Sequence, residues 1–495
     1  MNAALLSTFG LYLLMMLVVG GWGYRATANF DDYILGGRRL GAWVTALSAG
    51  ASDMSAWLLM GLPGAVFLSG IAESWIAIGL IIGAYLNWRF VAARLRLYTE
   101  MTNNALTLPD FFAQRFNDEK HILRVASALV ILVFFTIYCA SGIVAGARLF
   151  SNMFDITYTQ AIYVSALCTI TYVLIGGFLA VSWTDAIQAS LMFFALVFTV
   201  LSALFAVGNG IGEGVAWQSF FKDSQLDFLS GTSIIGVISS LAWGLGYFGQ
   251  PHILVRFMAA DSVKTMPAAR RIGMIWMTIC LFAAVAIGMV GVIYFGVYPE
   301  QSAVVSQNAE MVFIELANKI FNPWWVGVMM AAILAAVMST LSCQLLVCSS
   351  ALTEDFYRNF LRKTATHNEL IWVGRIMVGV VSLVAILISL DPQSRVLTMV
   401  SYAWAGFGAA FGSVILLSLF WGKLTKNGAL AGMITGAITV VVWKHFAIWG
   451  LYEILPGFVL AIFMAVVVSL LEKPNADLIK RHFAFEQHFR QKMKN

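Results

Sequence analysis

The chain has 495 residues, of which 60% are hydrophobic and only 11% are charged, with a formal net charge of +5. A soluble domain carries about 25% charged residues, so this composition excludes a soluble domain and indicates an integral membrane protein. The long apolar runs predict helices, because the strands of a membrane barrel would be short and alternating. The net charge does not indicate a nucleic-acid partner, because the basic residues lie in loops between the apolar runs.

Thirteen apolar runs are long enough to cross a bilayer. The first lacks a positive n-region and a small-residue cleavage site, so we interpret it as a retained span and not as a signal peptide. We therefore predict an all-α polytopic membrane protein with thirteen transmembrane helices, at about 3–24, 40–68, 71–93, 122–150, 158–181, 185–207, 231–255, 270–296, 323–352, 368–389, 396–421, 427–449 and 452–471.

The distribution of basic residues predicts the orientation of the chain. With the N-terminus outside, all but five of the 30 Lys and Arg residues fall in cytoplasmic loops or in the C-terminal tail, and Arg256 is counted in one of these loops. The positive-inside rule then predicts an outer N-terminus and a cytoplasmic C-terminus. The short basic tail after Lys473 either lies near anionic lipid or is simply solvated.

The second run, 40–68, carries an ionisable residue at membrane depth. Asp53 lies between Ser52 and Ser55, and the run is a poor continuous helix because it also contains Gly50, Gly61, Pro63 and Gly64. A carboxylate in the bilayer costs roughly 2.5–3.5 kcal/mol on insertion scales. An unwound helix frees backbone carbonyls that suit a cation. We predict a broken helix at an ion site; the alternative is a kinked span whose Asp53 pairs with a neighbouring helix.

A second interrupted run follows about 190 residues later. Glycines and a proline again fall in mid-membrane, in the stretch 243–252, at a corresponding place in a second block of five spans. Two consecutive blocks of five spans have opposite orientations, because five is odd. Paired interrupted spans in two inverted halves indicate the central binding site of a transporter.

The ninth span carries a polar stripe. Ala336, Ser339, Thr340 and Cys343 follow the spacing i, i+3, i+4, i+7 and so lie on one helical face. Two hydroxyls beside small residues suit a hard monovalent cation. The alternative is that both hydroxyls bond back to carbonyls of their own helix and do nothing else.

Aromatic residues lie mid-span beside glycines, where a substrate would fit: Trp57, Tyr138, Trp243 and Tyr247. Aromatic faces pack a small apolar ring and attract an ammonium group, each worth about 0.5–2 kcal/mol. The alternative is ordinary packing or an interface belt.

Two further features leave their roles open. Asp185 follows the fifth span and either attracts an exiting cation on a cytoplasmic ion path or caps the sixth helix, and we favour the cap. The five cysteines lie in apolar spans without metal-type spacing, which predicts free buried thiols and no disulfide framework.

Several motifs are similar to the sodium/solute symporter family, and they extend from about residue 10 to about residue 470. The stretches 29–38, 47–55 and 339–344 resemble the family as a whole. The stretches 244–252 and 401–408 resemble its bacterial members that import proline. One departure is Ala56, where those members carry Gly; the extra methyl group bears on affinity more than on the identity of the substrate.

The resemblance implies a leucine-transporter-type fold with an inverted repeat of five plus five helices. It implies the divisions 1–39 (first helix and cytoplasmic loop), 40–207 (first repeat, spans 2–6), 208–421 (outer loop and second repeat, spans 7–11), 422–472 (spans 12–13) and 473–495 (cytoplasmic tail). It also implies a sodium site formed by the carbonyls of Ala51, Met54 and Ala336 and the hydroxyls of Ser339 and Thr340, with Asp53 required nearby. Proline would be held by Ser55, Trp57, Tyr138, Trp243, Tyr247, Gln250 and Pro251.

We therefore expect a secondary active transporter that couples inward sodium flow to uptake of L-proline across a bacterial inner membrane, with no obligate protein partner. A symporter for another small amino acid or a carboxylate is the alternative within this class. A membrane solute sensor is the alternative from another class, but the short tail leaves no room for a signalling domain. An enzyme is not expected, because the spans contain no catalytic dyad, triad or metal cluster.

Overall fold

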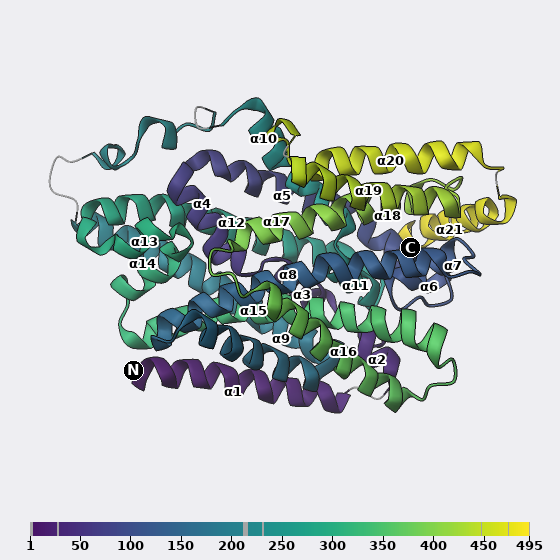
Figure 1. Cartoon of the computed structure of the whole chain (residues 1–495), viewed down its shortest axis with the longest axis horizontal. Coiled ribbons are helices and arrows are strands. Elements are labelled where there is room, and N and C mark those ends of the chain that lie inside the picture. Colours follow the sequence, from purple (N-terminus) through teal and green to yellow (C-terminus); the bar gives the residue numbers. More distant parts are fainter. Residues whose placement is uncertain are drawn as a thin grey trace.

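The computed structural model describes residues 3–26, 29–210, 216–229, 232–446, 448–473 and 475–494. These residues form helices and no strand, apart from one isolated bridge between Leu40 and Ala260. Most long helices run along the long axis of the molecule, and the two ends of the chain lie toward opposite ends of this axis (Figure 1). The arrangement is that of a bundle whose helices would cross a membrane together.

The bundle is made of helices α1 (Ala3–Ala26), α3 (Ala42–Asp53), α4 (Leu62–Ser69), α5 (Ser74–Leu86), α6 (Ala93–Met101), α8 (Ile122–Phe154), α9 (Tyr158–Gly210), α10 (Ile234–Leu241), α11 (Pro251–Ala259), α12 (Met266–Val297), α15 (Pro323–Ser350), α16 (His367–Ile388), α17 (Val396–Phe407), α18 (Ser413–Phe420), α19 (Lys426–Phe446) and α20 (Ile454–Leu471). The helices at its two ends are α2 (Phe30–Leu35), α7 (Leu108–Arg115), α13 (Ala303–Gln307), α14 (Val312–Ile320) and α21 (Ala476–Lys494).

The count of thirteen spans is not confirmed. Within the described residues, ten helices are long and apolar enough to cross a membrane, and one bent pair makes eleven. The other two predicted spans, 158–181 and 231–255, are helical but interrupted. The first is the start of α9, which turns at Gly177 with φ 63° and ψ −174°. The second is divided among α10, a 3₁₀ segment η7 (Ala242–Gly249) and α11.

The bent pair is the predicted broken helix. Helix α3 ends at Asp53, and the chain continues through a wide turn η2 (Trp57–Gly61) into α4 at an angle of 60°. Met54 leaves the helical conformation, with φ −78° and ψ 74°. A side chain at Gly50 would come within 2.7 Å of the Trp276 ring, so glycine permits close packing just before the break.

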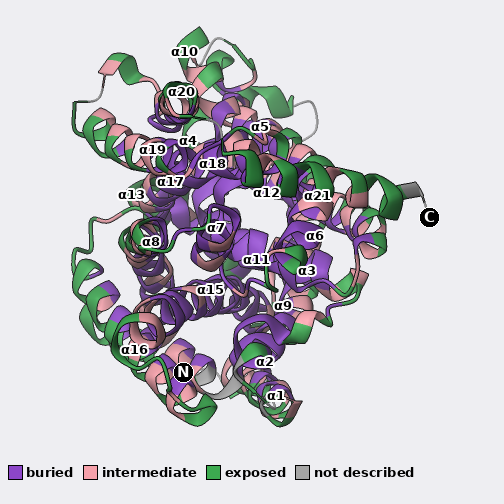
Figure 2. Ribbon diagram, turned by 90° about the vertical axis from the view of Figure 1, so that its right-hand side faces the viewer, coloured by how far each residue is buried: buried purple, intermediate pink, exposed green. Residues whose placement is uncertain are grey.

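The most buried long helix is α15, which packs against α1, α8, α9 and α16. Figure 2 looks along the bundle and shows α15 and α11 as mainly buried, whereas the outer helices expose one side. An exposed apolar side is expected where lipid replaces water. The segments η2, η7 and α11 at the two breaks, together with α15, therefore place most of their side chains in the interior of the bundle, whereas α10 has no buried residue.

Candidate functional site

The polar stripe of α15 faces the broken end of α3. The Ser339 hydroxyl donates to the Ala51 carbonyl at 2.9 Å and to the Ala336 carbonyl at 3.2 Å, and the Thr340 hydroxyl donates to Ala51 at 3.3 Å. Ser339 and Thr340 are buried. Two carbonyls and two hydroxyls therefore converge from helices that are almost 290 residues apart in the chain.

This convergence shows that the two hydroxyls do more than bond back to their own helix. Hydroxyls that only bond back to their own helix would leave α3 untouched, whereas both hydroxyls here reach across to it. The Met54 carbonyl, the fifth predicted ligand, follows directly on the end of α3, where the backbone has left the helical pattern. Four neutral oxygens in a dry interior are a suitable donor set for a hard monovalent cation. The described residues contain no group of three or more His, Cys, Asp or Glu side chains that would hold a metal ion.

Asp53 connects this region to the second interrupted segment. Its carboxylate accepts a short hydrogen bond from the Tyr247 hydroxyl in η7. Its backbone carbonyl accepts bonds from the Trp57 indole at 3.2 Å and from the Tyr138 hydroxyl at 3.5 Å. The other carboxylate oxygen, Oδ1, is buried and has no hydrogen-bond partner in the described part of the chain. The partner of Asp53 is thus a tyrosine of the neighbouring segment η7, which is a pairing of the kind that the alternative interpretation expected, while Oδ1 is left over for a further interaction.

The predicted aromatic residues form one buried cluster. The rings of Trp57 and Trp243 lie 6.4 Å apart, and Trp404, from α17, lies 6.5 Å from Trp243 and 5.1 Å from Tyr247. The Trp404 indole donates to the Trp243 carbonyl at 2.8 Å. A side chain at Gly246 would lie 1.9 Å from this indole nitrogen, so the glycine is required for the contact.

The remaining predicted residues lie at the two breaks. The Ser55 hydroxyl accepts from the Trp57 amide at 3.4 Å. Gln250 donates to the Trp404 carbonyl at 3.1 Å, and its own side-chain oxygen is buried and unpaired within the described residues. Pro251 begins α11, where its missing N–H costs no helical hydrogen bond.

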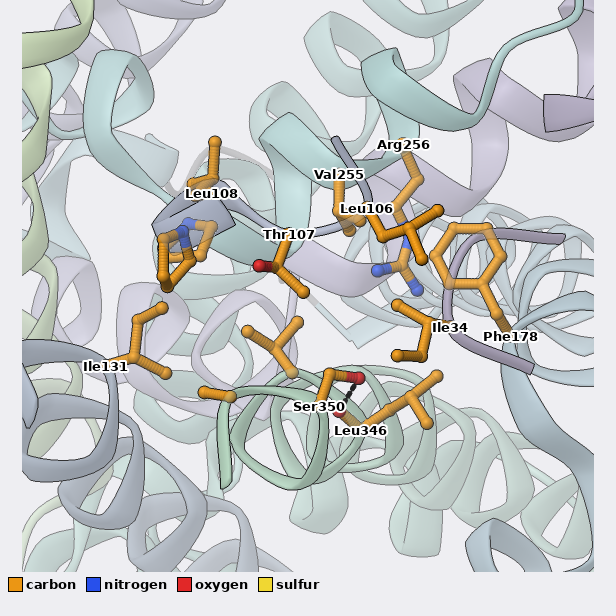
Figure 3. Close-up of a pocket in the computed structure, with 14 residues that line it drawn as sticks. Ile34, Leu106, Thr107, Leu108, Ile131, Phe178, Val255, Arg256, Leu346 and Ser350 are labelled. Atoms are coloured by element: carbon orange, nitrogen blue, oxygen red, sulfur yellow. Dashed lines mark hydrogen bonds between the residues drawn. The ribbon is translucent and has the colours of Figure 1, made fainter. Parts of the chain in front are cut away.

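Pockets lie on two sides of this cluster. One has a volume of about 480 Å³ and is lined by residues near the predicted outer ends of the helices, including Trp243, Ser401, Tyr452 and Glu453. The other, shown in Figure 3, has a volume of only about 20 Å³ and is lined by Thr107, Ile131, Phe178, Val255, Arg256 and Ser350 among others, and also by Pro251. Trp243 and Pro251, which sequence analysis assigned to one substrate site, therefore face different pockets.

Asp185 does not cap a helix, so this interpretation was wrong. It lies within α9, beyond the turn at Gly177, and is fully buried. Its carboxylate contacts Arg256 at 3.3 Å and accepts a hydrogen bond from Ser48 at 2.7 Å. Cys343 also contacts it, at 3.4 Å. Asp185 thus joins α9 to α3, α11 and α15.

Sequence analysis also missed several buried residues. It placed Arg256 in a cytoplasmic loop, whereas the side chain is buried in α11 and also bonds to the His252 carbonyl at 3.0 Å. The His252 ring lies against Phe135 and Tyr138, with both ring nitrogens buried and unpaired among the described residues. The motif that contains Gln250 and Pro251 could have indicated both residues. It begins α11 at a break inside the bundle, so the residues that follow are buried.

Comparisons with known proteins agree with this geometry. The model of the family described as "Sodium:solute symporter family" matches residues 33–436. The chain is 60% identical over 489 residues to a sodium/proline symporter of Escherichia coli, covering 99% of this chain and 97% of that protein. It is 48% identical to a high-affinity proline transporter of Bacillus subtilis, covering 94% of this chain and 98% of the relative.

A solved structure of a Na⁺-coupled sialic acid symporter, in a substrate-bound outward-open state, matches with a TM-score of 0.79. It covers 96% of this chain and 99% of its own at 19% identity. This likeness confirms the expected leucine-transporter-type fold. Together with the family model, which spans most of the sequence, and the close relatives, these findings show that the chain belongs to the sodium:solute symporter family.

Proposed function

We propose that the protein couples inward movement of sodium to import of L-proline. The observation that carries this proposal is the contact of Ser339 and Thr340 with the Ala51 carbonyl, directly before the break at Asp53. The relatives named as proline transporters are 46–60% identical to the chain over nearly its whole length, which supports proline as the substrate. A transporter and not an enzyme is the activity typical of the family.

Sodium would be bound by the carbonyls of Ala51, Met54 and Ala336 and the hydroxyls of Ser339 and Thr340. When the ion enters, each hydroxyl turns its hydrogen away and presents a lone pair, so the hydrogen bonds to Ala51 are exchanged for ion contacts. Asp53 would supply a negative charge near the ion, because the five ligand oxygens are all neutral. Its unpaired oxygen Oδ1 remains free to interact as the ion binds.

Proline would lie beside the two breaks, held by Ser55, Trp57, Tyr138, Trp243, Tyr247, Gln250 and Pro251. Its ring would pack on the aromatic faces, which also attract the secondary ammonium group. Its carboxylate would face free N–H groups at the helix breaks. Tyr247 belongs to this group and also bonds to Asp53, so the arrangement of the ion site affects the substrate site directly.

A pocket of about 480 Å³ on one side of the cluster and a nearly closed one of about 20 Å³ on the other support alternating access, with one side of the site open at a time. Trp243 lines the pocket of about 480 Å³, and Pro251 lines the pocket of Figure 3. A transporter of this class opens one side of its site at a time by moving one group of helices against another. We assign the first pocket to entry from outside and the second to release into the cytoplasm.

This assignment requires an orientation. We place the N-terminus outside and the C-terminus in the cytoplasm of a bacterial inner membrane, because the basic loops then lie inside. One net charge that crosses 100 mV supplies about 2.3 kcal/mol. Since about 1.4 kcal/mol is tenfold in concentration, one sodium ion supports roughly fifty-fold accumulation from the membrane potential alone.

Uptake of labelled proline by the purified protein in liposomes tests the proposal. A sodium gradient should drive accumulation above the outside concentration, and a potassium gradient of the same size should not. Counterflow of labelled proline into liposomes preloaded with unlabelled proline, without an ion gradient, separates transport from sensing. Equal uptake under both gradients would reject sodium coupling, and sodium-driven uptake of another labelled amino acid or carboxylate without uptake of labelled proline would select the alternative substrate class.

A further inference from the structure

A third pocket lies away from the central site, between the end of α7 and the C-terminal helix α21. It has a volume of about 490 Å³, and its lining includes Tyr98, Gln114, Arg115 and Arg481. Figure 2 shows α7, α6 and α21 together at the end of the bundle that faces the viewer. None of these residues takes part in the proposed sodium or proline site.

Arg115 is the unusual residue of this pocket. The side chain is only 2% exposed, yet Nε and both terminal nitrogens make no hydrogen bond within the described residues. Its guanidinium lies over the Tyr98 ring at 5.3 Å, a contact that leaves all its N–H groups unpaired. Buried arginines are normally paired with an acid or with several acceptors, because five donors removed from water are costly to leave unsatisfied.

The acidic residues around the pocket are already engaged. Glu486 of α21 forms an ion pair with Arg94, and Glu100 forms one with Arg96 at 2.6 Å. The exposed Arg481 adds a second positive charge close enough to oppose that of Arg115. The Tyr98 hydroxyl is buried and also lacks a partner among the described residues. The pocket thus combines two guanidinium groups and a hydroxyl donor, and no acidic residue is among the described residues that line it.

The local field agrees with this excess of positive charge. Burial first, then the charge of Arg115, and finally that of Arg94 lower the pKa of His482 to about 4, against an opposing effect of Glu486. His482 lies on α21 and packs against Tyr98, with ring centres 6.0 Å apart. The imidazole is therefore neutral at physiological pH and adds no charge, so the site needs an acceptor and not another donor.

We propose that this pocket binds an oxyanion of the phosphate class, which bridges Arg115 and Arg481 and holds α21 against α6 and α7. Phosphate oxygens match the planar fork of a guanidinium, and a hydroxyl donor completes such a site. The same chemistry is offered by the headgroup of an acidic phospholipid and by inorganic phosphate or a soluble phosphate ester. The inference does not depend on the proposed transport of proline.

Thermal unfolding of the full-length protein tests the site and its source. In zwitterionic detergent, inorganic phosphate is titrated against chloride at equal ionic strength. In nanodiscs, phosphatidylcholine alone is compared with phosphatidylcholine containing phosphatidylglycerol. Stabilisation by phosphate assigns the site to soluble anions, and stabilisation only by phosphatidylglycerol assigns it to a headgroup; either result supports the proposal. No stabilisation in either series overturns it.

Three variants locate the effect. Arg115→Gln and Arg481→Gln should each weaken the apparent affinity for the stabilising anion at least tenfold. Arg490→Gln is the matched control, because Arg490 is an exposed arginine of the same helix that does not line the pocket. Arg481 is exposed, so its replacement keeps the test valid if Arg115→Gln does not fold. A wild-type response in Arg481→Gln, or an equal loss in Arg490→Gln, would show general charge screening and reject the site.

Discussion

The Tyr247 hydroxyl donates a short hydrogen bond to the Asp53 carboxylate, although the two residues are 194 positions apart in the chain. Asp53 ends the first half of one broken helix, and Tyr247 lies in the interrupted segment that corresponds to it in the second half of the chain. A single hydrogen bond therefore joins the two interrupted segments. A substrate that displaces or moves the tyrosine changes the surroundings of the carboxylate, which is a direct physical route for coupling between substrate and ion.

Replacing Asp53 with Asn should sharply reduce transport, mainly through weaker sodium binding. The amide keeps the size of the side chain but removes the only charge beside neutral ligands. A lost interaction with a charged group is worth about 1.5–3 kcal/mol, so the half-saturation for sodium should rise roughly ten- to hundredfold. Sodium activation curves of proline uptake measure it. Tyr247→Phe, which removes the hydrogen bond and keeps the charge, is compared with Asp53→Asn to separate the two contributions and should also change proline affinity. An unchanged sodium half-saturation in Asp53→Asn would return Asp53 to a structural role.

Ser339→Ala and Thr340→Ala should each raise the sodium requirement, because a buried cation loses an oxygen that water cannot replace. Proline binding at saturating sodium should recover at least in part. Ser342→Ala is the control, since the Ser342 hydroxyl bonds back to the Ser339 carbonyl of its own helix, at 3.0 Å, and makes no hydrogen bond to α3 within the described residues. Sodium titrations of proline binding by the three purified variants check this prediction. If the first two match the control, their contact with Ala51 serves packing alone.

The buried pair of Asp185 and Arg256 should contribute more to stability as a pair than either residue does alone. Removing one partner of a buried ion pair leaves an uncompensated charge and costs about 3–5 kcal/mol, whereas replacing both is often nearly neutral. Arg256→Gln should therefore lower the melting temperature of the protein in detergent strongly. The double variant Asp185→Asn/Arg256→Gln should regain most of this loss. Additive losses in the double variant would mean that the two charges act independently.

The docking of α21 should weaken in mild acid. His482 lies among Arg94, Arg115, Tyr98 and Glu486, and its folded pKa of about 4 lies below the ordinary value of 6.5. The undocked state binds the proton more readily, so docking is fully stabilised above about pH 6.5 and is lost progressively as the pH falls toward 4. A nitroxide label at position 483 should become more mobile over this range. In His482→Gln the pH dependence should disappear; if it persists, another group controls docking.

The sequence contained enough information for the elements that depend on local chemistry. Helix breakers around Asp53 predicted the broken span, and the spacing of Ser339 and Thr340 predicted one polar face. The family motifs added the prediction that the polar face of the ninth span lies against the break at Asp53. The structure places these site residues at the two breaks, and their contacts with sodium and proline are part of the proposed function.

Other features depend on tertiary contacts that no local pattern reports. Arg256 belongs by composition to a basic loop, and only its contact with Asp185 explains why a charge is buried there. Asp185 precedes an apolar run and so resembled a cap, because the actual turn at Gly177 lies eight residues earlier. The count of thirteen spans is not confirmed for a related reason, since the two interrupted segments are apolar but are not continuous helices long enough to be counted by length.

The last prediction concerns the aromatic wall of the substrate pocket. Trp243→Ala removes a large apolar face beside Trp57 and Trp404, together with its attraction for the ammonium group of proline. The loss of burial and of cation–π attraction should cost on the order of 2–4 kcal/mol, a roughly thirty- to thousandfold loss of proline affinity. Sodium binding should change only through coupling. Trp372→Ala, which alters an exposed tryptophan of α16, is the control.

The same wall should exclude sugars, because their hydroxyls would lie unpaired against aromatic rings. Competition assays with excess unlabelled solutes on the wild type and both variants decide the matter: strong competition by glucose, or wild-type proline affinity in Trp243→Ala, would place the substrate elsewhere in the protein.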